Sequence, residues 1–337
     1  MNIGINYPWQ NYGWDFGDPP AEWVPAASRS AWREESRQAI TAKLAEIASL
    51  GITAVRWFIL GDGTNYGLGP EAPRLHQGQW LFDPLPPEHP FYAQLREDFE
   101  FLLATCEANG LKLLPSLIDF QWAWPGETPP GSRTVIKCGW GQVLTDPHRR
   151  EAFLTRVLDP LLELSYDNRD QIVAWELINE PEWVISQPWY VLWNRDPKRT
   201  ISRGKMREFL TAGLRRINQY RGGVFRSTVG FAFARSVREW RSIGATLDQF
   251  HYYPAPGEPL PAGLESSIVG ELATAANFQP WPELTEQTVL ARIRLLESRG
   301  FPAAYLWSAT DTGDPRDATS WTPDEQAQVA EYNRLRV

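Results

Sequence analysis

The sequence predicts a single (β/α)8 barrel, a ring of eight parallel strands surrounded by helices, with long loops at the carboxyl ends of the strands. Short apolar or β-branched runs alternate with longer amphipathic segments, which is the pattern of a parallel sheet covered by helices. Although 337 residues would suit two domains, no segment has the composition of a linker. We therefore expect one domain over residues 1–337.

The eight predicted strands are the short apolar runs. They are expected at residues 3–7, 54–58, 111–117, 172–179, 228–231, 249–252, 267–270 and 304–307. Eight strands with helices between them favour a closed barrel.

Helical patterns separate most of these strands. They are expected at residues 34–50, 90–109, 147–164, 205–220 and 285–299, with a last helix at 323–335. Gly51, Gly110 and Gly300 each follow a helical pattern, where glycine is the usual left-handed stop signal.

Three connections depart from the regular pattern. The fifth and sixth strands leave room only for a short helix at 236–243, and residues 254–263 show no helical pattern. The segment 61–89 is long for a barrel loop and is expected to lie on the carboxyl face, where barrel enzymes build specificity.

Two glutamates, Glu180 and Glu271, each close an apolar run that reads as a buried strand. A carboxylate at the carboxyl end of a barrel strand usually belongs to an active site. Two carboxylates facing one another are what cleavage of a glycosidic bond requires, because one protonates the leaving oxygen while the other attacks or stabilises the sugar cation. The alternative is that both are ordinary surface glutamates at strand ends.

Composition excludes several other classes of function. The formal charge of -8, with scattered Lys and Arg, argues against a nucleic-acid partner. No apolar run reaches the roughly 18 residues of a membrane span, and nothing in the sequence implies a protein partner. Because the first strand begins at residue 3, we expect no signal peptide and a cytoplasmic protein, or a secreted one if a leader has been removed.

Neither cysteines nor histidines predict a metal site. Cys106 and Cys138 lack the spacing of a metal or redox motif, and the four histidines include no pair at ligand spacing. The sequence therefore predicts no metal and no cofactor.

Several separated positions together resemble the glycoside hydrolases of clan A, most closely family 5, which includes cellulases and β-mannanases. The triplet Asn179-Glu180-Pro181 looks like the family's acid/base motif, and Glu271 looks like its nucleophile. The family's supporting residues are matched in type and place by Arg56, His251, Tyr253 and Trp307.

The sequence departs from the family 5 pattern at one place, and two other features favour one subgroup of the family. Family 5 members often carry a histidine near the end of the third strand, where residues 116–121 of this chain have none. The sequence at 251–254 and the tryptophan-rich loops suggest mannanase-like members more than typical cellulases.

The resemblance implies a retaining mechanism with carboxyl groups about 5 to 5.5 Å apart. Glu271 would attack carbon 1, while Glu180 would act first as acid and then as base. Glu180 must then stay protonated, through burial and the negative charge of Glu271, whereas Glu271 must stay ionised. Arg56 and Tyr253 are the expected partners of Glu271.

The supporting residues each have a structural alternative. Asn179 is expected to donate to the sugar 2-hydroxyl, or to form a turn before proline. Trp307 is expected to stack on the sugar ring, or to fill the barrel mouth. His251 would orient Glu180 or contact substrate, or be a core residue, and Glu176 is expected to form a structural ion pair.

Aromatic residues follow the strands where substrate would lie, and the chain holds 17 tryptophans. Each is expected either to stack on successive sugar rings or to pack a loop against the barrel. They are Trp9 and Tyr12 after strand one, Tyr66 after strand two, Trp122 and Trp124 after strand three, and Trp183, Trp189 and Trp193 after strand four.

The favoured function is a retaining β-glycosidase acting on β-linked mannose- or glucose-containing chains, with endo-β-mannanase-like cleavage preferred. Two alternatives stay open. One is exo-action or transglycosylation on short oligosaccharides, and the other is a carbohydrate-binding barrel without hydrolysis. The sequence does not distinguish mannose from glucose, which differ at the 2-hydroxyl.

Overall fold

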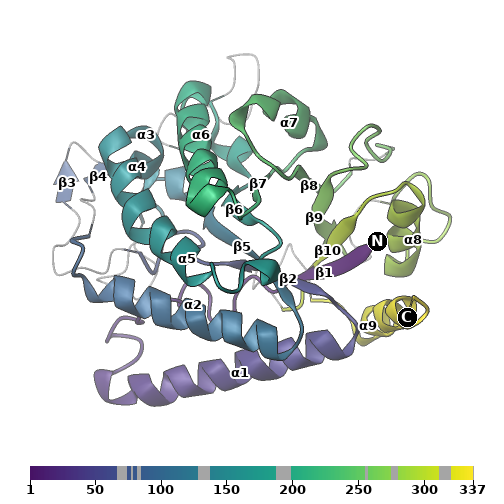
Figure 1. Ribbon diagram of the computed structural model, residues 1–337, viewed down its shortest axis with the longest axis horizontal. Coiled ribbons are helices and arrows are strands. Elements are labelled where there is room, and N and C mark those ends of the chain that lie inside the picture. Colours follow the sequence, from purple (N-terminus) through teal and green to yellow (C-terminus); the bar gives the residue numbers. More distant parts are fainter. Residues whose placement is uncertain are drawn as a thin grey trace.

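Eight parallel strands form one sheet that curls into a barrel, with helices outside it (Figure 1). The computed structural model describes residues 1–66, 74–76, 79–81, 85–127, 137–186, 199–254, 257–274, 280–310 and 320–336, with backbone alone at 74–76 and 79–81. The barrel strands are β1 (Asn2–Asn6), β2 (Ala54–Phe58), β5 (Lys112–Asp119), β6 (Trp175–Asn179), β7 (Ser227–Gly230), β8 (Gln249–Tyr252), β9 (Ile268–Ala273) and β10 (Ala303–Trp307).

The order of the strands around the ring is β7-β6-β5-β2-β1-β10-β9-β8. The ring closes between β7 and β8 through a parallel bridge from Phe231 to Phe250. The predicted (β/α)8 barrel is therefore confirmed, and every predicted strand lies within a few residues of its expected place.

Helices connect most successive strands. They are α1 (Arg29–Ser49), α2 (Pro90–Ala108), α3 (Gly141–Thr145), α4 (Pro147–Phe153), α5 (Asp159–Leu164), α6 (Arg203–Gln219), α7 (Ala234–Glu239), α8 (Val289–Ser298) and α9 (Pro323–Arg334). In Figure 1, α1 and α2 run side by side along one flank, and α8 and α9 lie beside the chain ends. Gly51, Gly110 and Gly300 all have the left-handed backbone expected of a helix stop.

The predicted helix at 147–164 is not regular. It consists of α4, one π-helical turn over Leu154–Leu158, and α5. Pro160 has no N–H to donate to the preceding turn, and this lost hydrogen bond coincides with the change of helical register.

Three further details differ from the sequence prediction. The first helix begins at Arg29, earlier than expected, and the long segment 61–89 contains a small antiparallel hairpin of β3 (Arg74–His76) and β4 (Gln79–Leu81). A short helix, α3, precedes α4. Between β8 and β9, residues 254 and 257–267 contain no helix, as the sequence predicted.

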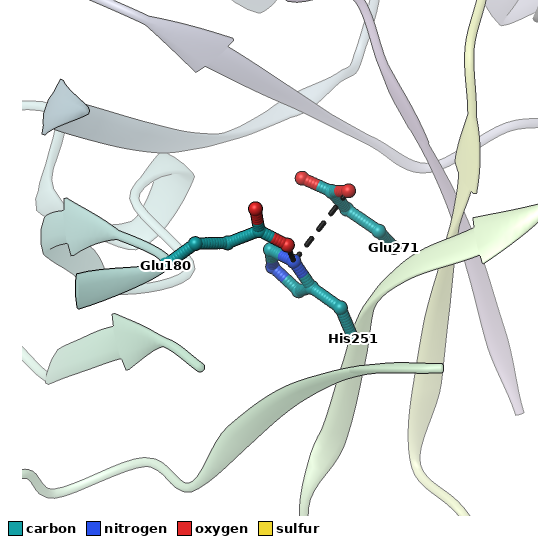
Figure 2. Close-up of side chains that lie close together, drawn as sticks. All are labelled: Glu180, His251 and Glu271. Carbon is teal, nitrogen blue, oxygen red and sulfur yellow. Dashed lines mark hydrogen bonds and ion pairs between the residues drawn. The ribbon is translucent and has the colours of Figure 1, made fainter. Parts of the chain in front are cut away.

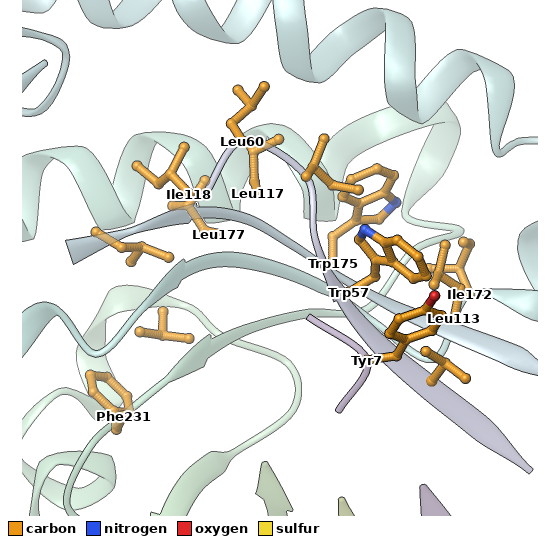
Figure 3. Packing of buried hydrophobic residues seen from close by; sticks show 14 of the residues in the cluster. Tyr7, Trp57, Leu60, Leu113, Leu117, Ile118, Ile172, Trp175, Leu177 and Phe231 are labelled. Carbon is orange, nitrogen blue, oxygen red and sulfur yellow. The ribbon is translucent and has the colours of Figure 1, made fainter. Parts of the chain in front are cut away.

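The apolar core lies between the strands and the helices. Figure 3 shows Trp57, Leu113, Trp175 and Leu177 in this layer, and all four are buried. The strands bury both faces, which explains why they read as continuous apolar runs. Within the part of the chain that the structure describes, no helix is both long and apolar enough to cross a membrane.

The barrel interior also carries polar side chains, and strand register brings them into layers. Asn6 is paired with Arg56 between β1 and β2, Asp119 with Asn179 between β5 and β6, and His251 with Glu271 between β8 and β9. Residues distant in the sequence thus meet at the same height in the barrel.

A glycine substitution tests how tightly the barrel packs. A Cβ on Gly4 would lie 2.5 Å from the ring of Tyr305 on the adjacent β10. We expect Gly4→Ala to lower the free energy of unfolding by about 1–3 kcal/mol, because overpacked sites force neighbours to shift. Gly204 lies exposed in the first turn of α6, so Gly204→Ala should leave that free energy unchanged or raise it slightly. Chemical denaturation measures the free energy of unfolding of both variants. If Gly4→Ala is as stable as Gly204→Ala, the packing argument is contradicted.

Candidate active site

Glu180 directly follows β6 at the mouth of the barrel. Its backbone is left-handed, with φ 47° and ψ 49°, and its N–H donates to the carbonyl of Gly230 at 2.7 Å. This turn lets the side chain reach across the mouth while Pro181 begins the next short helical turn. The Glu180 side chain is 17% exposed, so it remains accessible to a ligand.

Glu271 lies within β9, which continues to Ala273 and is longer than the sequence predicted. Its Oε1 accepts a hydrogen bond from Arg56 Nη1 at 2.8 Å, and its Oε2 accepts one from the Tyr253 hydroxyl at 2.8 Å. Burial raises the pKa of Glu271 above its ordinary value, while the charge of Arg56 and the Tyr253 hydrogen bond oppose that rise. Both expected partners of Glu271 are in contact with it.

The two carboxylates approach each other from opposite sides of the mouth, with His251 between them (Figure 2). One oxygen of Glu180 and one of Glu271 lie within 4.8 Å of each other and of a His251 ring nitrogen. His251 Nδ1 lies 2.8 Å from Glu180 Oε1 and 3.5 Å from Glu271 Oε2. Burial lowers the pKa of His251 to about 4, so the ring is neutral at pH 7 and adds no positive charge.

Trp183 also contacts Glu180, since its indole N–H donates to Oε2 at 2.9 Å. The sequence predicts that Trp183 stacks on a sugar ring or packs a loop, which stays a prediction, and its indole N–H is also placed to orient the glutamate. The two oxygens of Glu180 are therefore held by different partners, His251 on one and Trp183 on the other.

Arg56 donates hydrogen bonds to residues on several strands inside the barrel. Its five N–H groups are all used, and the side chain is fully buried. Two go to Glu176, at 2.6 and 2.7 Å, and one each to Glu271, Asn179 and Asn6, at 2.8, 2.6 and 2.8 Å. The guanidinium therefore connects strands β1, β2, β6 and β9.

Glu176 forms the structural ion pair that the sequence predicted. Besides Arg56, it accepts hydrogen bonds from Ser116 and Gln249, each at 2.7 Å. Burial alone would raise the pKa of Glu176, but the charge and hydrogen bonds of Arg56 hold it below its ordinary value. A Cβ on Gly230 would lie 2.7 Å from Glu176 Oε1, so only glycine leaves room for this pair.

Asn179 lies three residues after Glu176, yet both contact Arg56. Strict alternation along a strand would turn them to opposite faces. The pairing of β6 with β7 shifts its register between these two positions, and this irregularity places both side chains inside the barrel. Asn179 Nδ2 donates to Asp119 Oδ2 at 2.8 Å, while its Oδ1 accepts from Arg56.

The aromatic residues predicted to line the cleft divide into two groups. Trp307 packs edge-on against Phe58 at 6.4 Å, and Trp9 packs against Phe58 and Tyr12 at 6.0 and 4.9 Å. These rings form a continuous aromatic wall from β10 to the loop after β1, and Trp9 and Tyr12 are partly exposed. Trp124 is also partly exposed and lies beneath Arg199, with 5.2 Å from the guanidinium to its ring.

Two predicted substrate contacts are wrong. Tyr66 is 3% exposed and Trp122 is 0% exposed, so neither ring can stack on a sugar. They stack on each other at 5.3 Å and pack against Phe153 and Trp140, which makes them core residues beneath the loops. Trp189 and Trp193 lie outside the described residues.

Glu180, His251 and Glu271 also present ligand atoms close enough to hold a metal ion. Against this, Arg56 already places a full positive charge 2.8 Å from the Glu271 carboxylate. A cation bound between the two glutamates would be repelled by that charge. The geometry fits a pair of carboxylates better than a metal centre.

Several residues of the site carried no signal in the sequence. Asn6, Ser116, Gln249 and Asp119 are small or common polar residues on apolar strands, and only their contacts reveal them. An isolated polar residue in an otherwise apolar barrel strand is the one feature that could have marked them.

The fold resembles those of solved β-mannan-degrading enzymes. No model of a known protein family matches the sequence, and no curated protein sequence matches it. The endo-1,4-β-mannanase of Eisenia fetida is 17% identical, with a TM-score of 0.64 over 99% of this chain and 90% of that one. The β-1,4-D-mannanase of Cryptopygus antarcticus is 15% identical, with a TM-score of 0.65 over 98% and 89%.

An exo-β-1,4-mannosidase from Opitutaceae bacterium strain TAV5 is also similar. It is 14% identical, with a TM-score of 0.59, and the match covers 100% of this chain but 59% of the mannosidase. At these identities the similarity establishes a shared barrel fold.

Removing Arg56 tests whether it holds the site together. We expect Arg56→Met to lower the free energy of unfolding at pH 7 by about 3–5 kcal/mol, because it leaves two buried carboxylates without their cation. The lowered pKa of Glu176 gives the wild type a stabilisation that is fully present above about pH 4.5, whereas in the variant burial without the cation raises this pKa, so the uncompensated charge is neutralised as the pH falls from 7. The deficit of the variant should therefore shrink between pH 7 and pH 4.

Denaturation at both pH values measures this deficit. Lys205→Met is the matched control, because the pair of Lys205 with Glu208 is exposed to solvent and contributes little to stability. An Arg56→Met deficit that stays constant with pH would show that lost packing, rather than the buried charges, causes the instability.

Proposed function

We propose that this protein is a retaining β-glycoside hydrolase that cleaves β-linked mannose- or glucose-containing chains. The single observation that carries the proposal is the pair of carboxylates, Glu180 and Glu271, with oxygens within 4.8 Å of each other at the mouth of the barrel. Retaining glycosidases place their carboxyl groups about 5 to 5.5 Å apart, whereas inverting ones leave room for a water molecule between them.

Glu271 is the nucleophile in this proposal. Its carboxylate attacks carbon 1 while Glu180 gives its proton to the leaving oxygen, so the glycosidic bond breaks as the glycosyl ester forms. Glu180 then takes a proton from water, which attacks carbon 1 and releases Glu271. Two inversions restore the original configuration of the sugar.

The surroundings of the two glutamates suit these different roles. Glu271 is held by a cation and a hydroxyl donor, both of which favour its ionised form. Glu180 contacts a neutral imidazole and an indole N–H and forms no ion pair with Arg56, whose N–H groups are all committed elsewhere. The cation therefore stabilises the proposed nucleophile rather than the proposed acid.

Mannose-containing chains are the favoured substrate, with endo-cleavage. The mannanases of Eisenia fetida and Cryptopygus antarcticus share the fold over nearly their whole length. The aromatic wall of Trp307, Phe58, Trp9 and Tyr12 would suit sugar rings next to the cleaved bond. Exo-action or transglycosylation is the second candidate, because an exo-β-1,4-mannosidase has a similar fold.

Hydrolysis of a small substrate panel tests the proposal. The panel holds mannan, manno-oligosaccharides, cello-oligosaccharides and aryl β-mannoside and β-glucoside, assayed with wild type, Glu180→Ala and Glu271→Ala. We expect one substrate class to be cleaved and both variants to lose at least about 1000-fold in kcat/KM on natural chains, a barrier increase of about 4 kcal/mol.

Azide distinguishes the two roles. It should restore Glu180→Ala on an activated aryl glycoside and give the β-azide, since the small anion replaces water without needing the base. Product patterns on manno-oligosaccharides separate endo- from exo-action. Binding of oligosaccharides without cleavage would instead support a carbohydrate-binding barrel and contradict the hydrolase proposal.

The hydrogen bond from Tyr253 gives a separate pH prediction. Tyr253 donates to the carboxylate of Glu271 and so stabilises its ionised form. Removing this donor in Tyr253→Phe should raise the pKa of Glu271 further, so the acidic limb of the kcat/KM profile should move to higher pH. We also expect kcat/KM at the optimum to fall by roughly tenfold, since hydrogen bonds to charged groups contribute about 1.5–3 kcal/mol.

Tyr252→Phe is the matched control for this measurement. Its hydroxyl donates to the backbone carbonyl of Glu258 and contacts neither Glu180 nor Glu271. The acidic limb should stay in place in this variant. A limb that moves equally in both variants, or in neither, would show that Tyr253 does not set the ionisation of Glu271.

A further inference from the structure

Asp119 occupies the last position of β5, at the mouth of the barrel. It is 9% exposed and lies in register with Asn179 on the neighbouring β6. One carboxyl oxygen accepts a hydrogen bond from Asn179 Nδ2 at 2.8 Å, and the other accepts one from the backbone N–H of Gln121 at 2.9 Å. Its side chain is therefore fixed by two donors from two different elements.

Asn179 is held at both ends of its amide group. Arg56 donates to Oδ1 at 2.6 Å, which fixes which end of the amide is oxygen. Asp119 accepts from Nδ2, which fixes the rotation of the amide plane. The second N–H of Nδ2 has no partner among the described residues, so one directed donor remains beside Glu180.

Asp119 lies outside the ion-pair network of Arg56. It makes no ion pair within the described part of the chain, and Arg56 is already committed to Glu176 and Glu271. Burial raises the pKa of Asp119 to about 8, with Glu180 and Asp62 as the nearby carboxylates that add to the rise. The hydrogen bonds from Asn179 and from the Gln121 N–H oppose that rise, because both are donated to the carboxyl oxygens.

We propose that Asp119 is a positioning residue that acts through Asn179, holding the free N–H of its amide in the direction of the sugar 2-hydroxyl. The inference rests on the proposed glycoside hydrolase function. Mannose and glucose differ only in the direction of that hydroxyl, so a donor fixed in one direction favours one epimer. Asp119 thereby contributes to the choice of sugar without touching it.

The test compares substrates with and without the 2-hydroxyl. Activated aryl β-glycosides are prepared from the sugar that the substrate panel identifies, with the 2-hydroxyl present or removed on the ring that bears the aryl group. Removing it from a mannoside or a glucoside gives the same 2-deoxy sugar, so one reference serves both epimers. The quantity measured is the ratio of kcat/KM for the hydroxylated substrate to that for the 2-deoxy substrate.

Four proteins form a double-mutant cycle: wild type, Asp119→Ala, Asn179→Ala and the double variant. We expect the ratio to fall about tenfold in Asp119→Ala and at least as far in Asn179→Ala, the size of one lost hydrogen bond. The double variant should match Asn179→Ala, because Asp119 acts only through the amide. The preference between mannoside and glucoside should weaken along with the ratio.

Two further variants separate positioning from general structure. Asp62 is a second buried carboxylate at the mouth, bonded to Tyr12 and Thr64 rather than to Asn179, so Asp62→Asn should leave the ratio unchanged. Asp119→Asn keeps one acceptor in place of two and should give a ratio between those of wild type and Asp119→Ala. If Asp119→Ala does not fold, Asp119→Asn replaces it in the comparison of kcat/KM ratios.

The outcomes are distinct. If Asp119 variants lower kcat/KM for both substrates equally and leave the ratio unchanged, the role is structural and the inference is overturned. If Asp119→Ala lowers the ratio as much in the Asn179→Ala background as alone, Asp119 does not act through Asn179 and the inference is also overturned. If wild type cleaves no glycoside, the proposed function fails and the inference fails with it.

Discussion

The fully buried guanidinium of Arg56 holds the interior of this barrel together. It places a positive charge between two carboxylates, Glu176 below and Glu271 at the mouth, and all five of its N–H groups have acceptors. Burying so many charged groups costs free energy unless each is paired and hydrogen-bonded. The neighbouring strands therefore supply small polar residues, Ser116, Gln249 and Asn6, and a glycine at 230 that leaves the space.

The different surroundings of the two site glutamates follow from that arrangement. Because Arg56 reaches Glu271 and not Glu180, the two carboxylates lie close together in unlike electrostatic environments. His251 lies between them as a neutral ring, since burial keeps its pKa well below 7. Acid and nucleophile roles require two nearby carboxyl groups in unlike surroundings.

Sequence patterns located the strands and both glutamates but did not identify the purpose of each aromatic residue. Tyr66 and Trp122 follow strands just as Trp9 does, yet they are buried against Trp140 and Phe153 while Trp9 remains partly exposed. Whether a loop aromatic faces solvent depends on which other loop covers it, and that partner is distant in the sequence. The same limit applies to Asp119, whose significance lies in its contact with Asn179 on another strand.

Resemblance to a known family singled out Arg56, His251 and Tyr253, while the sequence by itself determined the barrel, the order of its elements, and the places of Glu180 and Glu271 near strand ends. The barrel elements and the strand ends are local properties, because strand and helix periodicities depend on residues that are close together in the sequence. Only the tertiary structure decided the left-handed turn at Glu180, the register shift that turns Asn179 inward, and which donors each carboxylate receives. These depend on the pairing of separate strands, where one step of register changes the face to which a side chain points.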